Sequence, residues 1–365
     1  MADSRTIHQP IHPSVRSKLD PEYVALHDSI IQYMEPSEAK PWDPASRSAP
    51  NPLAHTTQKL SPVGKQWDED IPGEEIQVRV FVPEGNQPEG GWPCLVWLHG
   101  GGWVNGGLDS ENGFLTHTIK TDVKCVVVTI NYRHAPEHVY PAAVDDCLTG
   151  LKWLYDPSNA SRLGINTSLV TIGGLSAFVT PSPSIPSSTN HRRQPRRGPN
   201  NEPHPLTHPH LPAPRWSATR HVPWLTPTRM GWYQDLYFSR GEQDKKEWRA
   251  SPCFAPRELL AESPRTWLAV AGVDLLTTEG LAYARLLREN GVEVESAVYE
   301  GATHSVLVLA GADILTFLSS SVHQISRKLV HDACAVLAKG FGTSYDPAAA
   351  PILSQEDRED VVLDS

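Results

Sequence analysis

A histidine and three consecutive glycines end an apolar stretch in the second quarter of the chain. Residues 94–98 read Cys-Leu-Val-Trp-Leu, which predicts a buried strand, and His99, Gly100, Gly101 and Gly102 follow directly. Glycine permits a sharp turn and leaves its backbone N–H uncovered by a side chain. Such N–H groups at the end of a strand can stabilise the oxyanion that forms during acyl transfer. The alternative is a tight glycine turn without a chemical role.

A serine that could act as a nucleophile lies at the end of another predicted strand. The β-rich stretch 168–172 leads through Gly174 to Ser176. A serine on a tight strand-to-helix turn projects its hydroxyl from the top of the sheet, and the N–H of the next residue, here Ala177, then faces the oxyanion. Phe178 stands where the motif has its second glycine, so the motif is incomplete and an ordinary strand end remains the alternative.

An acid and a base follow in the order that this chemistry uses. Residues 266–274 predict a strand that ends in Asp274, and the alternating stretch 292–299 is followed closely by His304. His304 would take the proton from Ser176 and return it to the leaving group, while Asp274 would hold the imidazole in the required tautomer. The alternatives are a helix N-cap for Asp274 and a solvent-exposed loop position for His304.

Taken together, these segments resemble the hormone-sensitive-lipase-like family of α/β-hydrolase fold serine esterases. The segments that carry the resemblance are His99–Trp103, Asn131–His138, Pro141–Ala143, Asp145–Asp146, Val273–Leu276 and Gly301–His304. The resemblance implies a carboxylic ester hydrolase that uses no metal and no cofactor and acts on small-molecule esters with small or medium acyl chains. It implies Ser176, Asp274 and His304 as the catalytic triad and Gly101, Gly102 and Ala177 as the oxyanion hole, with Gly100 shaping the hole.

The elements that must position these residues alternate between strands and helices, which is typical of an α/β protein with a mostly parallel sheet flanked by helices. The periodicity predicts an N-terminal cap helix over 15–35, an irregular connection over 36–72, strands over 76–82 and 125–131, and helices over 144–154, 281–287 and 315–329. We therefore expect a cap and connection over 1–72, an α/β-hydrolase domain over 73–340 and an acidic tail over 341–365.

The segment 178–223 departs from this pattern. It holds 11 of the 33 prolines and six arginines against a single acidic residue, Glu202. The helix and strand that the fold needs after the nucleophile are missing from it, and its composition predicts disorder or an aberrant insert, as a shifted reading frame or a retained intron would produce. A proline-rich ligand at 181–186 and a basic nucleic-acid patch at 192–197 remain alternatives.

Composition limits the other possibilities. The net charge of −10 argues against binding to a nucleic-acid backbone, and no apolar stretch is long enough to span a membrane. Five cysteines, an odd number without close pairs, are typical of a reducing compartment, so we expect a cytoplasmic protein. A non-catalytic small-molecule-binding relative and a degenerate product without a stable fold remain alternative interpretations. A role in secondary metabolism and the oligomeric state both stay open.

Overall fold

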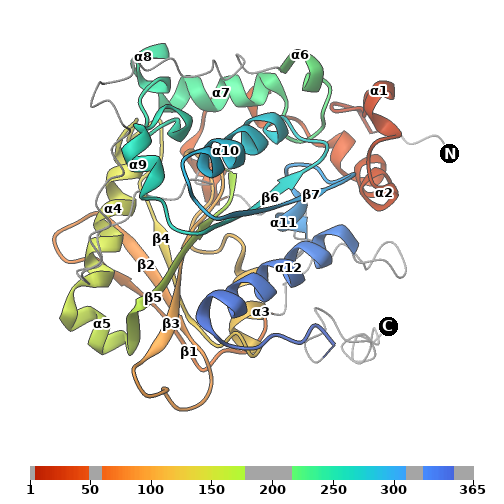
Figure 1. The fold of residues 1–365 in the computed structure, drawn as a ribbon. Coiled ribbons are helices and arrows are strands. Elements are labelled where there is room, and N and C mark those ends of the chain that lie inside the picture. The colour runs from red at the N-terminus through yellow and green to blue at the C-terminus, as the bar shows by residue number, and fades with distance from the viewer. Residues whose placement is uncertain (1–4, 49–59, 177–215, 310–323, 349–365) are drawn as a thin grey trace, which may run out of the picture.

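The central layer of the protein is a five-stranded sheet. The computed structural model describes residues 5–48, 60–176, 216–309 and 324–348. The strand order across the sheet is β1 (Lys65–Asp70), β2 (Gln77–Val82), β4 (Val126–Asn131), β3 (Trp92–Leu98) and β5 (Ile165–Gly174) (Figure 1). Only β2 runs against the others, because it is antiparallel to both β1 and β4 while β3 is parallel to β4 and β5. The prediction of a mostly parallel sheet in an α/β-hydrolase fold is confirmed.

Two further strands form a separate parallel pair, β6 (Thr266–Ala271) and β7 (Val294–Tyr299). Within the described residues no strand joins β5 to β6. Residues 177–215 lie outside the described part, and most of the segment predicted to be disordered falls there.

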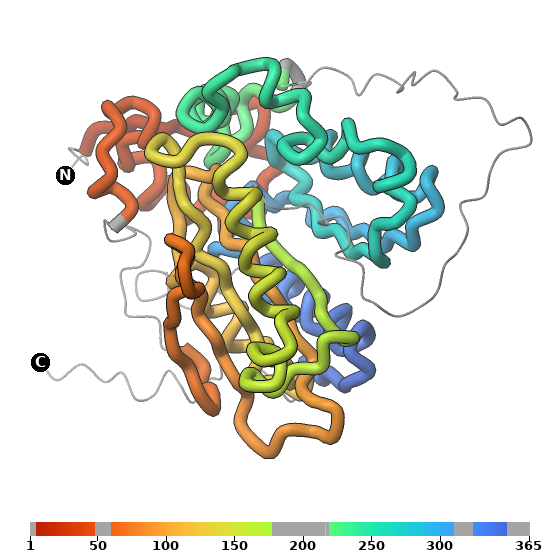
Figure 2. The backbone as a smooth tube through the Cα atoms, turned by 90° about the vertical axis from the view of Figure 1, so that its left-hand side faces the viewer, coloured from red at the N-terminus to blue at the C-terminus, as the bar shows by residue number. Residues whose placement is uncertain are grey.

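Helices cover both faces of the large sheet (Figures 1 and 2). All seven residues of β3 are buried, so this strand forms the centre of two apolar clusters. One cluster includes α4 (Ala142–Tyr155) and α5 (Pro157–Leu163), and the other includes α3 (Asn112–Lys120) and α12 (Gln324–Phe341). The helices predicted over 144–154 and 281–287 are confirmed as parts of α4 and α10 (Thr277–Glu289).

The prediction of one cap helix over 15–35 is wrong. The structure has α1 (Pro13–Arg16), α2 (Pro21–Ser29) and a 3₁₀ turn at Ile31–Tyr33. Asp20 caps α2 by accepting hydrogen bonds from the N–H groups of Glu22 and Tyr23, and Pro21 occupies the first helical position. This N-terminal capping signal starts a new helix at this point, although the apolar periodicity predicts one continuous helix.

Two further expectations were wrong in part. The connection expected to be irregular over 36–72 contains β1, whose polar residues pair with β2 at the sheet edge and hide the strand signal. Residues 216–223, expected to be disordered, begin with α6 (Trp216–Thr219) and include the buried Val222. Val222 packs into an apolar cluster that also holds α1 and α2, so these contacts supply the order that composition did not predict.

The C-terminal region is described only in part. α12 continues the predicted C-terminal helix from Gln324 to Phe341, while residues 310–323, which hold the start of the predicted helix, lie outside the described residues. The acidic tail expected over 341–365 is described as far as residue 348, and its Tyr345 packs against the cluster formed by α3 and α12.

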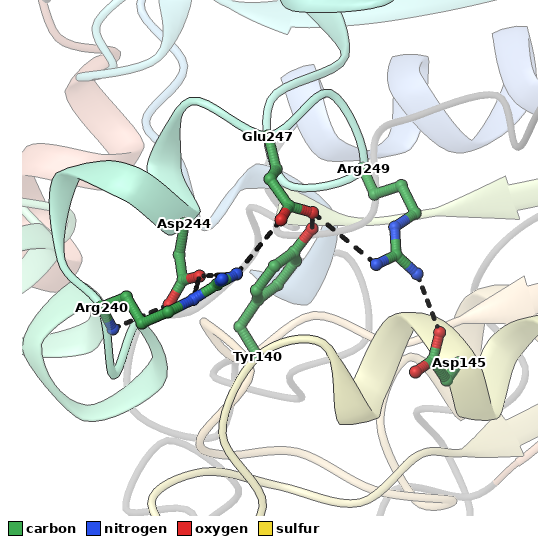
Figure 3. Close-up of polar contacts among 6 residues, drawn as sticks. All are labelled: Tyr140, Asp145, Arg240, Asp244, Glu247 and Arg249. Atoms are coloured by element: carbon green, nitrogen blue, oxygen red, sulfur yellow. Dashed lines mark hydrogen bonds and ion pairs between the residues drawn. The ribbon is translucent and has the colours of Figure 1, made fainter.

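A polar network fixes the turn after α7 (Pro227–Tyr237) to the body of the protein (Figure 3). The buried carboxylate of Asp244 accepts hydrogen bonds from Arg240, and Glu247 accepts one from the Tyr140 hydroxyl at 2.7 Å. Arg249 reaches Asp145 of α4 at 3.0 Å. The remaining short elements are α8 (Glu242–Lys245), α9 (Arg257–Ala261), α11 (Val306–Leu309) and 3₁₀ turns at Ser37–Ala39, Pro44–Ser48 and Pro252–Phe254.

Candidate active site

The structure brings together the serine, the histidine and the aspartate singled out in the sequence. His304 Nε2 lies 2.7 Å from Ser176 Oγ, and His304 Nδ1 lies 2.8 Å from Asp274 Oδ2. Ser176 directly follows Leu175 at the end of β5 and has a φ of +61°, a left-handed conformation that residues other than glycine rarely adopt. This strained turn agrees with the strand-to-helix turn predicted for a nucleophile.

The alternatives for Asp274 and His304, a helix N-cap and a solvent-exposed loop position, do not fit the structure. α10 begins after Leu276 without any side-chain cap, so Asp274 is not its N-cap. Asp274 is buried, with 6% of its surface exposed, and its carboxylate faces the imidazole. The side chain of His304 is only 14% exposed, because it lies between the other two groups. The three residues therefore form a hydrogen-bonded row.

Two of the glycines adopt conformations that other residues could not take. Gly101 has a φ of +127°, and a Cβ there would lie 2.0 Å from the carbonyl oxygen of Asn105. Gly102 has a φ of +62°, and a Cβ there would lie 2.6 Å from the ring of Tyr233. Within the described residues, neither N–H donates to a backbone acceptor. Both N–H groups are thus free to bind an anion.

The glycine loop, residues 99–102, lies beside the serine. A Cβ added to Gly100 would contact the side chain of Leu175 at 3.2 Å, and the Leu175 N–H donates to the Leu98 carbonyl at 3.2 Å. Ala177, the third predicted member of the oxyanion hole, lies outside the described residues, so its part stays a prediction.

A buried histidine supports the base of the glycine loop. His99 stacks on Tyr132 at 4.2 Å between ring centroids, and its Nδ1 lies 2.8 Å from the Gly100 carbonyl oxygen. The Tyr132 hydroxyl donates to the His99 carbonyl at 2.9 Å. Burial lowers the pKa of His99 to about 4, so the ring is neutral near pH 7 and Nδ1–H acts as the donor to Gly100.

Sequence reasoning missed the helix that covers the glycine loop. Besides the contact between Tyr233 and Gly102, α7 places Tyr237 flat against Trp103, with ring centroids 4.5 Å apart. Two tyrosines four residues apart share one face of a helix, so this spacing could have indicated the contact.

The N-terminal helices contact the loop that carries His304. The Asp20 N–H donates to the Gly301 carbonyl at 3.1 Å, and Gly301 has a φ of +78°. Tyr23, on α2, is fully buried in an apolar cluster that also holds Val273 and Leu275, the residues on either side of Asp274. No local sequence signal indicated these contacts, because they join residues about 250 to 280 positions apart.

Other kinds of site have less support in the described residues. No group of three or more His, Cys, Asp and Glu side chains among them is arranged to hold a metal ion. In the same residues, no helix combines the length and the apolar character needed to cross a bilayer.

Comparisons with known proteins agree with the geometry. Residues 95–308 match the family model described as alpha/beta hydrolase fold, and residues 31–136 match the carboxylesterase family. An AB hydrolase superfamily protein of Schizosaccharomyces pombe is 34% identical over 82% of this chain and 90% of its own length. The carboxylic ester hydrolase LipN of Mycobacterium tuberculosis is 32% identical over 66% of this chain and 64% of its own.

A solved α/β-hydrolase from the metagenome of Lake Arreo superimposes with a TM-score of 0.68 at 22% identity, covering 90% of this chain and all of that one. That likeness shows the fold. The chain belongs to the hormone-sensitive-lipase-like family of α/β-hydrolases, which are serine esterases acting on carboxylic esters.

Proposed function

We propose that this protein hydrolyses carboxylic esters with small or medium acyl chains, using Ser176 as the nucleophile. The observation that carries the proposal is the row of hydrogen bonds from Ser176 through His304 to Asp274, with distances of 2.7 and 2.8 Å. His304 removes the proton from Ser176 as the hydroxyl oxygen attacks the ester carbonyl carbon. Asp274 keeps the proton of the neutral ring on Nδ1 and stabilises the imidazolium that forms.

The reaction proceeds in two stages. The bond from Ser176 Oγ to the carbonyl carbon forms first, and the negative charge on the carbonyl oxygen is stabilised by the N–H groups of Gly101 and Gly102, with Ala177 as the third expected donor. The bond to the alcohol then breaks as His304 gives its proton to the leaving oxygen. Water, activated by His304, hydrolyses the acyl-serine and restores the enzyme.

The aromatic residues near the glycine loop support the proposed limit on substrate size. The Tyr233 ring lies against Gly102, and Trp103 is held by Tyr237, so bulky side chains restrict the space beside the oxyanion hole. The free cysteines, four of the five of which are buried, support the further proposal that the protein works in a reducing compartment such as the cytoplasm.

The test is hydrolysis of p-nitrophenyl acetate, butyrate and octanoate by the full chain. We expect Ser176→Ala to lower kcat by a factor on the order of 10³ or more, since the attacking oxygen is lost, and His304→Gln to have a similar effect. Binding of esters without turnover by the wild-type chain would contradict the proposal and favour a non-catalytic binding protein. Full activity in Ser176→Ala would assign the reaction to another residue.

A further inference from the structure

An arginine near the N-terminus contacts the turn that follows the glycine loop. Arg47 lies in the 3₁₀ turn at Pro44–Ser48, and its side chain is 20% exposed. Its Nε donates a hydrogen bond to the carbonyl oxygen of the buried Val104 at 2.7 Å, and its Nη2 donates one to the carbonyl oxygen of Ala135. A single guanidinium therefore joins the turn after the glycines to the segment that follows β4.

The peptide that Arg47 contacts is hydrogen-bonded to a peptide of the proposed oxyanion hole. The Asn105 N–H belongs to the same planar peptide as the Val104 carbonyl, and it donates to the Gly101 carbonyl at 2.9 Å. The Gly101 carbonyl in turn shares a trans peptide with the Gly102 N–H, and in a trans peptide these two groups point in opposite directions. The orientation of the 104–105 peptide therefore sets the direction of the Gly102 N–H.

The second acceptor of Arg47 holds the same turn through a neighbouring group. The Ala135 N–H donates to the carbonyl oxygen of Trp103 at 3.0 Å, while the Ala135 carbonyl accepts the hydrogen bond from Arg47. Two consecutive carbonyl groups after the glycines, those of Trp103 and Val104, are therefore held by groups that Arg47 connects.

The guanidinium is itself held in place by two further side chains. It lies over the ring of Trp42, 4.8 Å from the ring centroid, and it forms an ion pair with Glu137. Trp42 packs against Trp232 of α7, with ring centroids 6.0 Å apart. A planar guanidinium that stacks on an aromatic ring and hydrogen-bonds at its edge has few alternative positions.

We propose that Arg47 is a positioning residue for the oxyanion hole, acting through the Val104–Asn105 peptide on the N–H of Gly102. Without Arg47 the 104–105 peptide is free to rotate, and the Gly102 N–H is no longer held toward the position that the oxyanion occupies. Glu137 neutralises the guanidinium, so Arg47 acts through its two directed hydrogen bonds rather than through its charge. This role rests on the proposed esterase function.

The test compares two variants of Arg47 in the full chain on p-nitrophenyl butyrate. Arg47→Ala removes both donors, and we expect kcat to fall by about 5-fold to 50-fold while KM changes by less than about threefold, because the oxyanion exists only after attack. Arg47→Lys keeps the charge, but its single ammonium does not span the two carbonyl groups, so kcat should fall by more than about threefold.

Two control variants separate this contact from its surroundings. Glu137→Gln removes the ion pair and leaves the hydrogen bond from Arg47 to Val104, so its kcat should stay within about twofold of wild type. Arg79 is similarly buried, at 13% exposed, and donates to the Leu108 carbonyl at 3.1 Å, outside the turn that Arg47 holds. Arg79→Ala should therefore lower stability and leave kcat per active site near wild type.

Three further measurements distinguish positioning from a loss of folded protein. Titration with a phosphonate counts the reactive Ser176 groups, so that kcat refers to active sites. A trifluoromethyl ketone, which forms an oxyanion on addition to Ser176, should bind Arg47→Ala more weakly by the factor by which kcat/KM falls. Hydrogen exchange of the Asn105 amide, measured by mass spectrometry on overlapping peptides, should be slow in wild type and in Arg79→Ala and faster in Arg47→Ala.

The outcomes distinguish the two proposals. Wild-type kcat in Arg47→Ala or in Arg47→Lys, or fast exchange at Asn105 in the wild type, would each overturn the positioning role and leave the esterase function standing. A loss of kcat in Arg79→Ala or in Glu137→Gln as large as in Arg47→Ala would overturn it as well, by assigning the effect to lost stability or to the ion pair. A wild-type chain that hydrolyses no ester, or one whose rate survives Ser176→Ala, would overturn the proposed function and the role of Arg47 with it.

Discussion

The two halves of the candidate site are positioned by different means. Ser176 and the glycine loop follow strands β5 and β3 of the five-stranded sheet, in which β3 is buried along its whole length and paired on both sides. Asp274 and His304 follow β6 and β7, which pair only with each other within the described residues and keep several half-exposed positions.

The second half obtains its support from another part of the chain. α1 and α2 pack with Val273 and Leu275, on either side of Asp274, and Asp20 hydrogen-bonds to Gly301 in the loop that precedes His304. Hydrogen-bonded strands thus position the residues of the first half, whereas packed helices position the residues of the second half. A substitution among the residues that pack around the first half should therefore act mainly on stability, whereas one among the residues that support the second half should also change the rate. The triad residues themselves act on the rate in both halves.

The largest effect should come from the acid of the second half. Asp274→Asn keeps the shape but allows the wrong imidazole tautomer, so kcat should fall by a factor of about 10³ to 10⁴ with little change in thermal unfolding. Steady-state kinetics and a melting curve on the same preparation measure both. Glu279→Gln, which changes a carboxyl group on α10 and not the one beside His304, is the matched control with a rate near wild type. An Asp274→Asn variant as active as wild type would remove Asp274 from the triad.

The next prediction concerns the loss of stability at low pH, which buried histidines around the first half should cause. Burial lowers the pKa of His99 and of His117 to about 4 and that of His134 to about 3. Between these values and about 6.5 the unfolded chain binds more protons, so their contribution to stability is full above about pH 6.5 and is lost as the pH falls toward 4. Glu111, whose pKa is raised to about 7, acts in the opposite direction over about pH 4.5 to 7, but three groups outweigh one.

We therefore expect the free energy of unfolding to fall by several kcal/mol, on the order of 5, between pH 6.5 and pH 4. Urea unfolding followed by tryptophan fluorescence measures this dependence. His134→Gln should make it shallower, and an unchanged slope in that variant would show that the histidines do not cause the loss.

A third prediction compares two adjacent aspartates of α4. Asp146 is 2% exposed and accepts hydrogen bonds from the backbone and the guanidinium of Arg133, at 2.8 and 2.7 Å. Asp146→Ala leaves the N–H of Arg133 without its partner, so stability should fall by about 2–4 kcal/mol while kcat per folded molecule stays near wild type.

Asp145→Ala is the control for this prediction. Asp145 makes a 3.0 Å ion pair with Arg249, but both side chains are substantially exposed, at 52% and 32%. The expected loss is below about 1 kcal/mol. Equal losses for the two variants in urea unfolding would refute the distinction between a buried and an exposed pair.

The smallest effect tests the docking of the N-terminal helices. Tyr23→Phe removes the hydroxyl that hydrogen-bonds to His27 at 3.3 Å, so stability should fall by about 1 kcal/mol. Because Tyr23 packs with Val273 and Leu275 beside Asp274, and α2 begins at Asp20, which hydrogen-bonds to Gly301, kcat should also fall a fewfold, on the order of two to five, once unfolded protein is subtracted. Tyr33→Phe, outside this contact, is the control. A loss of stability without any change in kcat would show that α2 does not help to place His304.

Local sequence signals predicted most of the elements and the members of the hydrogen-bonded row. Apolar strands ending in polar residues identified β3, β5 and β6, and the order of Ser176, Asp274 and His304 along the chain matched their meeting in space. The strand β1 was missed because its polar residues lack an apolar period, although its partner β2 is plain in the sequence.

Local sequence patterns could not predict the residues that support the candidate site. Glu111 has an ordinary sequence context, and only the folded chain shows that its carboxylate accepts a hydrogen bond from Trp97 and that its φ is positive. The packing of Tyr23 with Val273 and Leu275 likewise depends on tertiary structure. The periodicity of a segment predicts which of its residues are buried, but it does not predict which distant segment packs against them.

The hydrogen bond from Asp20 to Gly301 has a consequence for how the protein is made. A ribosome adds about 5–20 residues per second, so the partner of Asp20 emerges roughly 15–60 s after Asp20 itself. For much of that interval Ile11, Val15 and Leu19, which the finished protein buries, lack their distant packing partners, among them Val222, Val273 and Leu309. The nascent N-terminus is therefore a natural binding segment for chaperones, and slower translation lengthens the period in which it needs one.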